Sequence, residues 1–279
     1  MEYLNGFESF YEVLWVFVIY SFIGWCTEVA YATLDTGKFI NRGFLNGPVC
    51  PIYGCGVIIV VSILTPIMHI PLLLFLGSML FTTLLELVVG FGLEKIFHHQ
   101  WWDYSMYPFN FKGYICLKFS ILWGLACTFV MYVVHPFIAK MIRIFPQKIG
   151  MVILVIALIG FATDCVIAIT TIFKFSKKLL YLEKVQAQLD KLSVNIGENI
   201  YENVSDVLEV PGYVKADLTE RKEEYQKKRQ ELLLKREELM KESKVLQHRI
   251  LKAFPHMKSR THKDALEKLR ELKEAMENK

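Results

Sequence analysis

The 279-residue sequence is 53% hydrophobic with a mean hydropathy of +0.33, which is too apolar for an ordinary soluble domain. Only eight of its 32 Lys and Arg residues precede residue 174, so the formal net charge of +4 comes mostly from the last part of the chain. This distribution predicts a transmembrane domain over residues 1–173 and a charged cytoplasmic helical tail over residues 174–279. Charges of both signs are mixed in the tail, which excludes a strong nucleic-acid signature.

Five apolar runs approach or reach the roughly 20 residues that a helix needs to cross a bilayer. The expected fold class is therefore all-α, a polytopic membrane protein with about five transmembrane helices. The second and third runs are separated by so few residues that they predict a tight helical hairpin. The runs are Val13–Leu34, Val49–Ile70, Leu72–Phe91, Ile115–Phe137 and Gly150–Phe173.

The orientation follows from the basic residues in short loops. An odd number of spans puts the two termini on opposite sides, and the charged tail is best kept in the cytoplasm. Loops 35–48 and 92–114 then face the cytoplasm, and the N-terminus lies outside. One loop disagrees, because Lys140, Arg143 and Lys148 would face outward. A re-entrant fourth or fifth segment would remove this conflict.

Beyond residue 173 the pattern is helical and charged. Residues 174–192 extend the last span into water, and residues 195–213, with Gly197 and Pro211, predict an irregular connection. A long helix is expected over Ala216–Ala253, ended by Pro255, with a second amphipathic helix over Lys263–Glu277. Polar companion positions favour a helical hairpin over a strict two-stranded coiled coil. The apolar positions that repeat every seven residues are Leu218, Tyr225, Leu232, Leu239 and Leu246.

Three acidic residues, Glu28, Glu86 and Asp164, lie inside the apolar runs. A carboxylate in hydrocarbon is costly, about 2.5–3.5 kcal/mol on insertion scales, so each needs a partner or a wet cavity. In one interpretation each acid pairs locally and holds the bundle together. In the other the acids share an interior site for a cation, a proton or a polar substrate. Arg42 and Lys118 are the candidate counter-charges, and Asn41 and Asn110 add neutral donors.

The segment from Gly43 to Gly56 is broken by several Gly and Pro residues. It is either a tight turn into the second helix or a discontinuous segment of the kind that forms binding sites in transporters. Asn41 and Arg42 precede it, where backbone groups without helical hydrogen bonds would need polar partners. We therefore take Glu28, Asn41, Arg42, Glu86 and Asp164 as candidate substrate-binding residues.

Motifs for chemistry are sparse. Glu94 and His98 are spaced i, i+4, so both could bind one metal ion from the same face of a helix. A helix at the membrane interface explains the same residues more simply, so we expect no metal. The six cysteines form no CxxC pair, and the sequence contains neither a G-x-S-x-G elbow nor an H-E-x-x-H motif. Gly37 and Lys38 lack the upstream glycine of an ATP-binding loop. We expect no cofactor and, on balance, no enzyme.

Several blocks resemble the bacterial family described as putative ABC-transporter type IV, the CmpB-like permease family. They are SFIGWCTE, GKFINRGFLNGPVCPIYG, LLELVVGFGLEKIF, WWDYS and ILWG, and the later RILKAFPHMKS is similar to the ending of that family. The resemblance implies a multi-pass protein of the bacterial inner membrane, a transport subunit whose ATPase would be a separate chain. It assigns no substrate and no site residue.

Three functions follow from these observations. The favoured one is a permease-like membrane protein with a polar intramembrane site and a tail that docks a partner protein or a second copy through residues 216–279. The alternative is a membrane-anchored scaffold or regulator that acts through its tail. The third is a membrane-embedded enzyme acting on lipid phosphates, suggested by Arg42, His98 and Asp103 near one interface.

Overall fold

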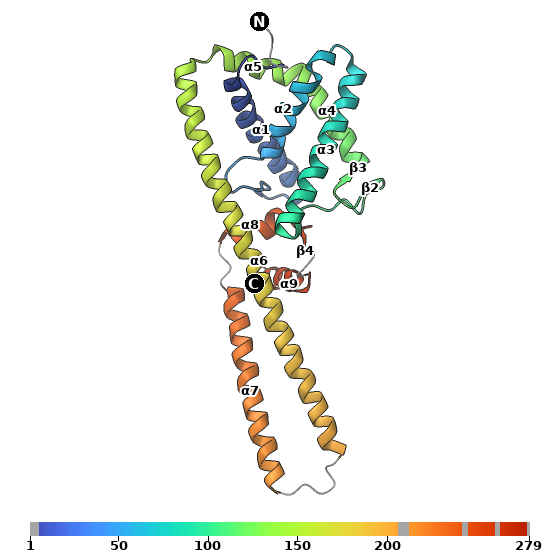
Figure 1. The fold of residues 1–279 in the computed structure, drawn as a ribbon, viewed down its shortest axis with the longest axis vertical. Helices are drawn as coiled ribbons and strands as arrows, with labels where there is room; N and C mark the ends of the chain where they lie inside the picture. Colours follow the sequence, from blue (N-terminus) through green and yellow to red (C-terminus); the bar gives the residue numbers. More distant parts are fainter. Residues whose placement is uncertain (1–5, 206–211, 242–244, 260–262, 278–279) are drawn as a thin grey trace. The chain divides into compact units, whose positions relative to one another are not determined.

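The computed structural model describes residues 6–205, 212–241, 245–259 and 263–277, and it is mostly helical (Figure 1). The chain forms two compact units. The first comprises residues 1–172 together with 248–260, and the second comprises residues 173–247 together with 261–279. A short part of the tail therefore belongs to the same unit as the apolar runs. The functional division at residue 173 stays a prediction.

The first unit is a bundle of apolar helices joined by short loops and two small sheets. Strand β1 pairs antiparallel with β4, and β2 pairs antiparallel with β3. In chain order the elements are α1 (Phe10–Thr36), α2 (Pro51–Leu64), a 3₁₀ turn (Thr65–Ile67), α3 (Pro71–Phe97), β1 (His99–Gln100), β2 (Asn110–Phe111), β3 (Ile115–Cys116), α4 (Leu117–Phe129), a π-helical turn (Val130–Val134), α5 (His135–Ile144), the start of α6 (Gln147–Ser205), the end of α8 (Val245–Ala253) and β4 (Lys258–Ser259).

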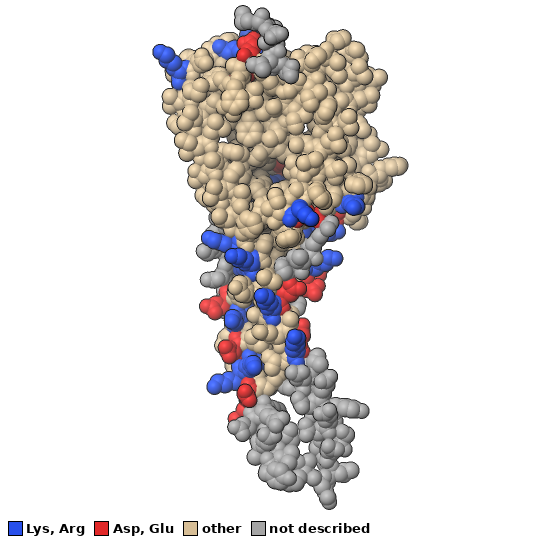
Figure 2. Space-filling model, viewed as in Figure 1, with Lys and Arg blue, Asp and Glu red and all other residues tan. Residues whose placement is uncertain are grey.

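Among the described residues, four helical segments have the length and composition to cross a membrane, so the chain is a multi-pass membrane protein. They are Phe10–Thr36, Pro71–Phe97, Leu117–Ile144 and Gln147–Leu192. The second apolar run forms a shorter apolar helix, Pro51–Ile67. The expected tight hairpin is present, since α2 and α3 pack together across the turn at residues 68–70. In Figure 2 the visible face of this unit is bare of charged side chains along most of its length.

Local sequence signals fix where these helices begin and end. Ser9 caps α1, because its hydroxyl accepts a hydrogen bond from the Glu12 N–H at 3.3 Å. Gly37 ends α1 with a left-handed backbone, φ 69°, which glycine adopts without strain. Pro51 and Pro71 stand in the first turns of α2 and α3, where no helical N–H is needed.

The fourth apolar run continues further than expected. After α4 the chain passes through the π-helical turn and Pro136, two recognised causes of helix bending, and continues as α5 to Ile144. Figure 1 shows α5 lying across one end of the bundle. Residues 138–144, expected as loop, are therefore helical, and they carry Arg143 onto the N-terminal end of α1.

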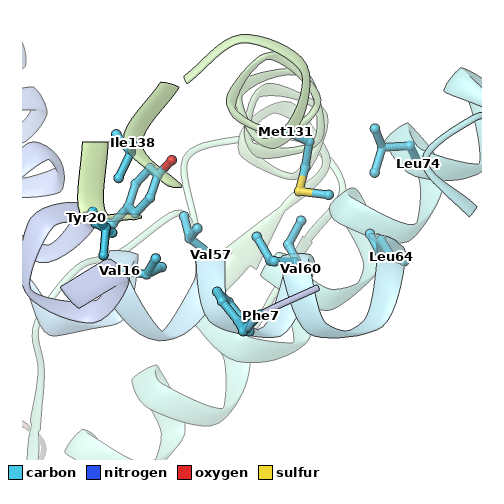
Figure 3. Close-up of a cluster of buried hydrophobic side chains, with 11 residues drawn as sticks. Phe7, Val16, Tyr20, Val57, Val60, Leu64, Leu74, Met131 and Ile138 are labelled. Carbon is cyan, nitrogen blue, oxygen red and sulfur yellow. The ribbon is translucent and has the colours of Figure 1, made fainter. Parts of the chain in front are cut away.

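The core of the first unit lies between α1, α2 and α5 (Figure 3). Val16 and Val61 are fully buried, and Tyr20 and Ile138 pack with them. The remaining buried members of this cluster are Phe7, Val57, Val60, Leu64, Leu74, Met131 and Ile142. This core packs the N-terminal half of α1 against α2.

The second unit contains the C-terminal part of α6, α7 (Gly212–Lys241) and α9 (Lys263–Glu277). The amphipathic helix expected at Lys263–Glu277 is confirmed. The irregular connection expected at residues 195–213 is wrong for residues 195–205, because α6 continues helically to Ser205 despite Gly197. Residues 206–211 lie outside the described residues.

The long tail helix expected over Ala216–Ala253 is helical wherever the structure describes it, as α7 (Gly212–Lys241) and α8 (Val245–Ala253). Residues 242–244 lie outside the described residues. Tyr225, Leu232 and Leu239 are half-buried along α7, whereas Leu234 is 63% exposed, as the sevenfold repeat predicts for one apolar face. The side chains of Leu218 and Leu246 lie outside the described residues.

Candidate functional site

The loop between α1 and α2, residues 37–50, is organised by the side chain of Asn41. Its carbonyl oxygen accepts hydrogen bonds from the Trp25 indole at 2.8 Å and from the Gly43 N–H at 3.0 Å. Its amide donates to the backbone carbonyl of Asn46 at 2.8 Å. Asn41 therefore folds the loop onto itself and ties it to α1.

Asp164 of α6 holds the far end of the same loop. Its Oδ1 accepts from the backbone N–H of Asn46 at 3.2 Å and from the Asn46 side chain at 2.9 Å, and its Oδ2 accepts from the Gly47 N–H at 2.7 Å. A Cβ atom at position 47 would lie 3.1 Å from that oxygen, so glycine permits the close approach. Non-helical backbone near a membrane needs such internal partners.

Glu28 lies at the contact between α1 and α2. The Tyr53 hydroxyl donates to its Oε1 at 2.7 Å, and Nε of Arg42 lies 3.9 Å from its Oε2. The Arg42 guanidinium also lies over the Tyr31 ring, 5.5 Å from the centroid. Gly24 makes this contact possible, because a Cβ atom there would lie 2.2 Å from Cγ of Tyr53. Glu28 and Arg42 keep 29% and 26% of their side chains exposed, so the pair is only partly covered by the protein.

Glu86 of α3 is the most deeply buried of the three predicted acids, with 8% of its surface exposed. The Tyr104 hydroxyl donates to its Oε1 at 3.0 Å, and the Trp123 side chain also interacts with the carboxyl group. Its Oε2 is buried without a hydrogen-bond partner among the described residues. A buried carboxylate oxygen in that state is costly unless it binds a proton or a cation.

Aromatic side chains connect the two acids. The centroids of the Tyr53 and Trp123 rings lie 5.6 Å apart, and the rings meet edge to face. Tyr53 therefore contacts both Glu28 and Trp123, and Trp123 interacts with Glu86. The negative charge of Glu28 acts on both Glu86 and Tyr104. Burial raises the pKa of the Tyr104 phenol well above its ordinary value, and the charge of Glu86 raises it further, so Tyr104 stays a donor.

A segment of the tail, residues 249–259, closes over the loops at this end of the first unit; we call it the C-terminal clasp. Arg249 donates to the carbonyl oxygens of Gly43 at 2.8 Å and Phe44 at 3.2 Å. The Phe254 ring lies 4.9 Å from that of Trp101. Lys258 forms an ion pair with Asp103, and β4 completes a two-stranded sheet with β1. The clasp therefore bridges the loop after α1 and the loop after α3.

The structure brings the predicted residues into two groups. Glu28, Arg42 and Glu86 belong to one network, whereas Asn41 and Asp164 shape the loop beside it. Two other predicted partners lie elsewhere. Lys118 lies over the Tyr107 ring at 4.9 Å, and Asn110 donates to the carbonyl oxygens of Ser105 and Tyr107.

Sequence reasoning missed the aromatic and C-terminal members of the site. The aromatic members are Tyr53, Tyr104 and Trp123. They carry no charge and follow no distinctive spacing. The sequence shows only that their hydroxyl or N–H groups could donate hydrogen bonds to buried acids. Arg249 lies 206 residues from Gly43, so no local pattern predicts their contact.

An ion pair at the opposite end of the bundle was also missed. Arg143 contacts Glu8 at 2.9 Å and Glu12 at 3.1 Å. Only 2% of the Glu12 side chain is exposed. Arg143, one of the three basic residues that conflicted with the expected orientation, is thus neutralised by two acids of the N-terminal segment.

The residues that suggested metal binding or lipid-phosphate chemistry are engaged elsewhere. Glu94 accepts a hydrogen bond from the Tyr114 hydroxyl, and Asp103 pairs with Lys258 while Arg42 pairs with Glu28. Within the described ranges, no group of three or more His, Cys, Asp or Glu residues could hold a metal ion.

The first unit contains a range that matches a known protein family. The model of the family described as putative ABC-transporter type IV matches residues 15–169, which is more than half of the chain. The matched range contains the network of Glu28, Arg42 and Glu86 and the whole of loop 37–50, but it stops short of the C-terminal clasp. Comparison with curated proteins and with solved structures found no match.

Proposed function

Because the chain belongs to the putative ABC-transporter type IV family, we propose that it is a permease-like membrane protein whose intramembrane site binds a cation or a proton. The site is the network of Glu28, Arg42 and Glu86. The observation that carries the proposal is the Glu86 oxygen Oε2, which is buried on a membrane helix without a hydrogen-bond partner among the described residues. Ionisable groups in this position mark ion or proton pathways in membrane proteins.

The charges of the site favour a positive occupant. Two carboxylates face a single guanidinium, and that guanidinium is 3.9 Å from Glu28. The repulsion between Glu28 and Glu86 falls when a proton or a cation binds between them or on either one. An anionic substrate would add a third negative charge to the same network.

Access to the site is consistent with this function. Figure 2 shows a hollow in the visible face of the first unit, with acidic and basic atoms at its bottom. Glu28 and Arg42 are the partly exposed part of the network, and Glu86 is the buried part. A cation would therefore meet Glu28 before Glu86.

The finer topology belongs to the same proposal. Pro51–Ile67 would act as a fifth, short span beside the four long ones. Loops 37–50 and 98–116 would then lie with the C-terminal clasp on the cytoplasmic side of a bacterial inner membrane. The ATPase, if the transport is ATP-driven, would be a separate chain. That partner protein or a second copy would dock through residues 216–279, most of which belong to the second unit.

Reconstitution into liposomes tests the function. Proton flux, reported by an enclosed pH-sensitive dye under an imposed membrane potential, and alkali-cation flux should exceed those of protein-free liposomes. Glu86→Gln should reduce the flux at least tenfold, and Glu28→Gln should reduce it less, because Glu28 is less buried. Asp35→Asn, at an exposed position near the end of α1, is the matched control and should leave the flux unchanged. Wild-type flux in a folded Glu86→Gln variant would contradict the proposal.

A second function, a membrane-anchored scaffold or regulator, is favoured by the contact of the C-terminal clasp with loop 37–50. In this case a partner bound to the tail would change the conformation of loop 37–50 through the clasp, or a change in the loop would alter how the tail binds its partner. A chain that ends before residue 174 lacks both the second unit and the clasp. Full flux in that truncated chain would contradict a regulatory role for the tail.

A further inference from the structure

The loop between α3 and α4 carries a groove that the proposed transport site does not use. The groove has a volume of about 460 Å³ and lies between the β2–β3 hairpin and the start of α4. The residues that line it are mostly apolar: Phe109, Phe111, Ile115, Cys116 and Leu117, with Asn110 and Ser120.

The hairpin presents large apolar side chains to its surroundings. Met106 is 90% exposed and Phe109 is 83% exposed. Phe111 and Leu117 are also exposed. In Figure 1, β2 and β3 project sideways from the bundle near the C-terminal end of α3. A hairpin that leaves the side of a membrane bundle near the end of a span lies at the bilayer interface, where aromatic residues are enriched.

Two lysines adjoin lining residues of the groove in the sequence, Lys112 after Phe111 and Lys118 after Leu117. Lys112 lies over the Phe111 ring at 5.9 Å, and Lys118 lies over the Tyr107 ring at 4.9 Å. Neither lysine forms an ion pair with a carboxylate within the part of the chain that the structure describes. Asp103, the acid of the same loop, is already paired with Lys258 of the C-terminal clasp.

We propose that this groove binds an anionic glycerophospholipid, with an acyl chain along its apolar wall, the phosphate beside Lys112, whose amine lies over the lining Phe111 ring, and Lys118 adding positive charge at the other end of the hairpin. A cationic rim beside an apolar groove at an interface has the two features that such a lipid presents, a negative headgroup and a hydrocarbon chain. The tight turn of the hairpin holds Lys112 in place. Phe109, Lys112 and Gly113 have φ values of 53°, 51° and 75°, and Asn110 ties the turn to the Tyr107 carbonyl at 2.7 Å.

Native mass spectrometry of the full-length protein in detergent tests the proposal. Phosphatidylglycerol should form bound adducts at lower concentration than phosphatidylcholine. Lysines near an anionic headgroup each contribute about fivefold in affinity, so Lys112→Gln with Lys118→Gln should weaken phosphatidylglycerol binding about thirtyfold and leave phosphatidylcholine binding unchanged. Equal adducts in the double variant, or no preference between the two lipids in the wild type, would overturn the proposal.

Two further arms separate the parts of the site. The control variant Lys140→Gln with Lys148→Gln removes two exposed lysines at the opposite end of the bundle and should keep the binding. Phe109→Ser with Phe111→Ser changes only exposed or partly exposed groove residues and should also weaken phosphatidylglycerol binding. Glycerol phosphate, which has the headgroup charge without the chains, should not compete at the same concentration. Full competition would show a phosphate site and overturn the lipid assignment.

Discussion

The Arg249 guanidinium donates a hydrogen bond to the carbonyl oxygen of Gly43 at 2.8 Å, although 206 residues separate the two. A second nitrogen of the same group donates to Phe44. The planar guanidinium thus satisfies two adjacent backbone carbonyls in a loop that has no helical partners for them. This contact links the tail to the loop that joins α1 and α2.

Replacement of Arg249 should loosen this loop. Hydrogen bonds from a charged donor contribute about 1.5–3 kcal/mol each, so Arg249→Gln should raise hydrogen exchange of residues 43–47 at least tenfold. Arg249→Lys should raise it nearly as much, because an ammonium group cannot span both carbonyls in the fixed geometry of the guanidinium. Lys252→Gln, at an exposed position of α8, is the control. Unchanged exchange in Arg249→Gln would show that the clasp does not hold the loop.

Asp164 should matter through its hydrogen bonds to loop 37–50. In Asp164→Asn, an amide NH₂ replaces one of two acceptor oxygens and faces donors from Asn46 or Gly47, so about 1–3 kcal/mol of stability should be lost. Thermal unfolding in detergent measures the loss. Thr163→Ala is the matched control, since Thr163 is exposed and bonds only the Ile159 carbonyl. Equal unfolding temperatures of the two variants would contradict a structural role for Asp164.

The contact between Asp103 and Lys258 should depend on pH. Burial raises the pKa of the Asp103 carboxyl, but hydrogen bonds from Lys258 and Ser105 outweigh it, so the net pKa lies below the ordinary value. A depressed pKa means that the contact stabilises the fold above the ordinary pKa of aspartate and is lost as the pH falls through the lowered value. Protection of the backbone amides in β1 and β4 against hydrogen exchange should therefore fall in acid.

The variant Asp103→Asn reproduces the acid state at neutral pH. Ion pairs that solvent reaches contribute about 0.2–1 kcal/mol, so the variant should raise exchange in β1 and β4 by at most about fivefold and remove its pH dependence below pH 5. A variant with the pH dependence of the wild type would assign that dependence to another group.

The architecture of the first unit follows largely from hydropathy, because membrane helices must be long and apolar to satisfy their backbone in lipid. Hydropathy therefore predicted the apolar helices and the α2–α3 hairpin. It did not predict the bend before α5, because Pro136 bends the helix without interrupting the apolar pattern. The irregular connection predicted from Gly197, Pro211 and Gly212 was wrong at residues 195–205, because a helix tolerates one glycine such as Gly197 at a cost of about 1 kcal/mol.

The candidate site was predictable only in part. Glu28 and Glu86 could be identified because an acid in an apolar run demands an explanation. Their shared network could not, since it depends on Tyr53 and Trp123, whose rings meet only when α2 and α4 have packed. The RILKAFPHMKS block was noticed for its resemblance alone. Its contact with the loop arises because residues 248–260 return to the first unit, and the hydrophobic periodicity of the sequence does not predict that return.

The close packing of α1 on α2, which places Tyr53 against Glu28, can be tested at Gly54. A Cβ atom at this position would lie 2.5 Å from the Phe17 carbonyl oxygen and 2.5 Å from the Ser21 hydroxyl. Backbone atoms cannot yield without moving the helix, so Gly54→Ala should separate α1 from α2 and destabilise the protein by about 1–3 kcal/mol.

Gly160 supplies the matched control for this test, because a Cβ atom there would meet nothing within 4 Å. Both positions are helical, so Gly160→Ala carries the same change in helix propensity and should leave the stability unchanged or slightly raised. Thermal unfolding in detergent should separate the two variants by several degrees. Gly54→Ala should also reduce cation flux, since it displaces the hydroxyl that donates to Glu28. If both variants unfold together and carry the same flux, the packing of α1 on α2 does not position the site.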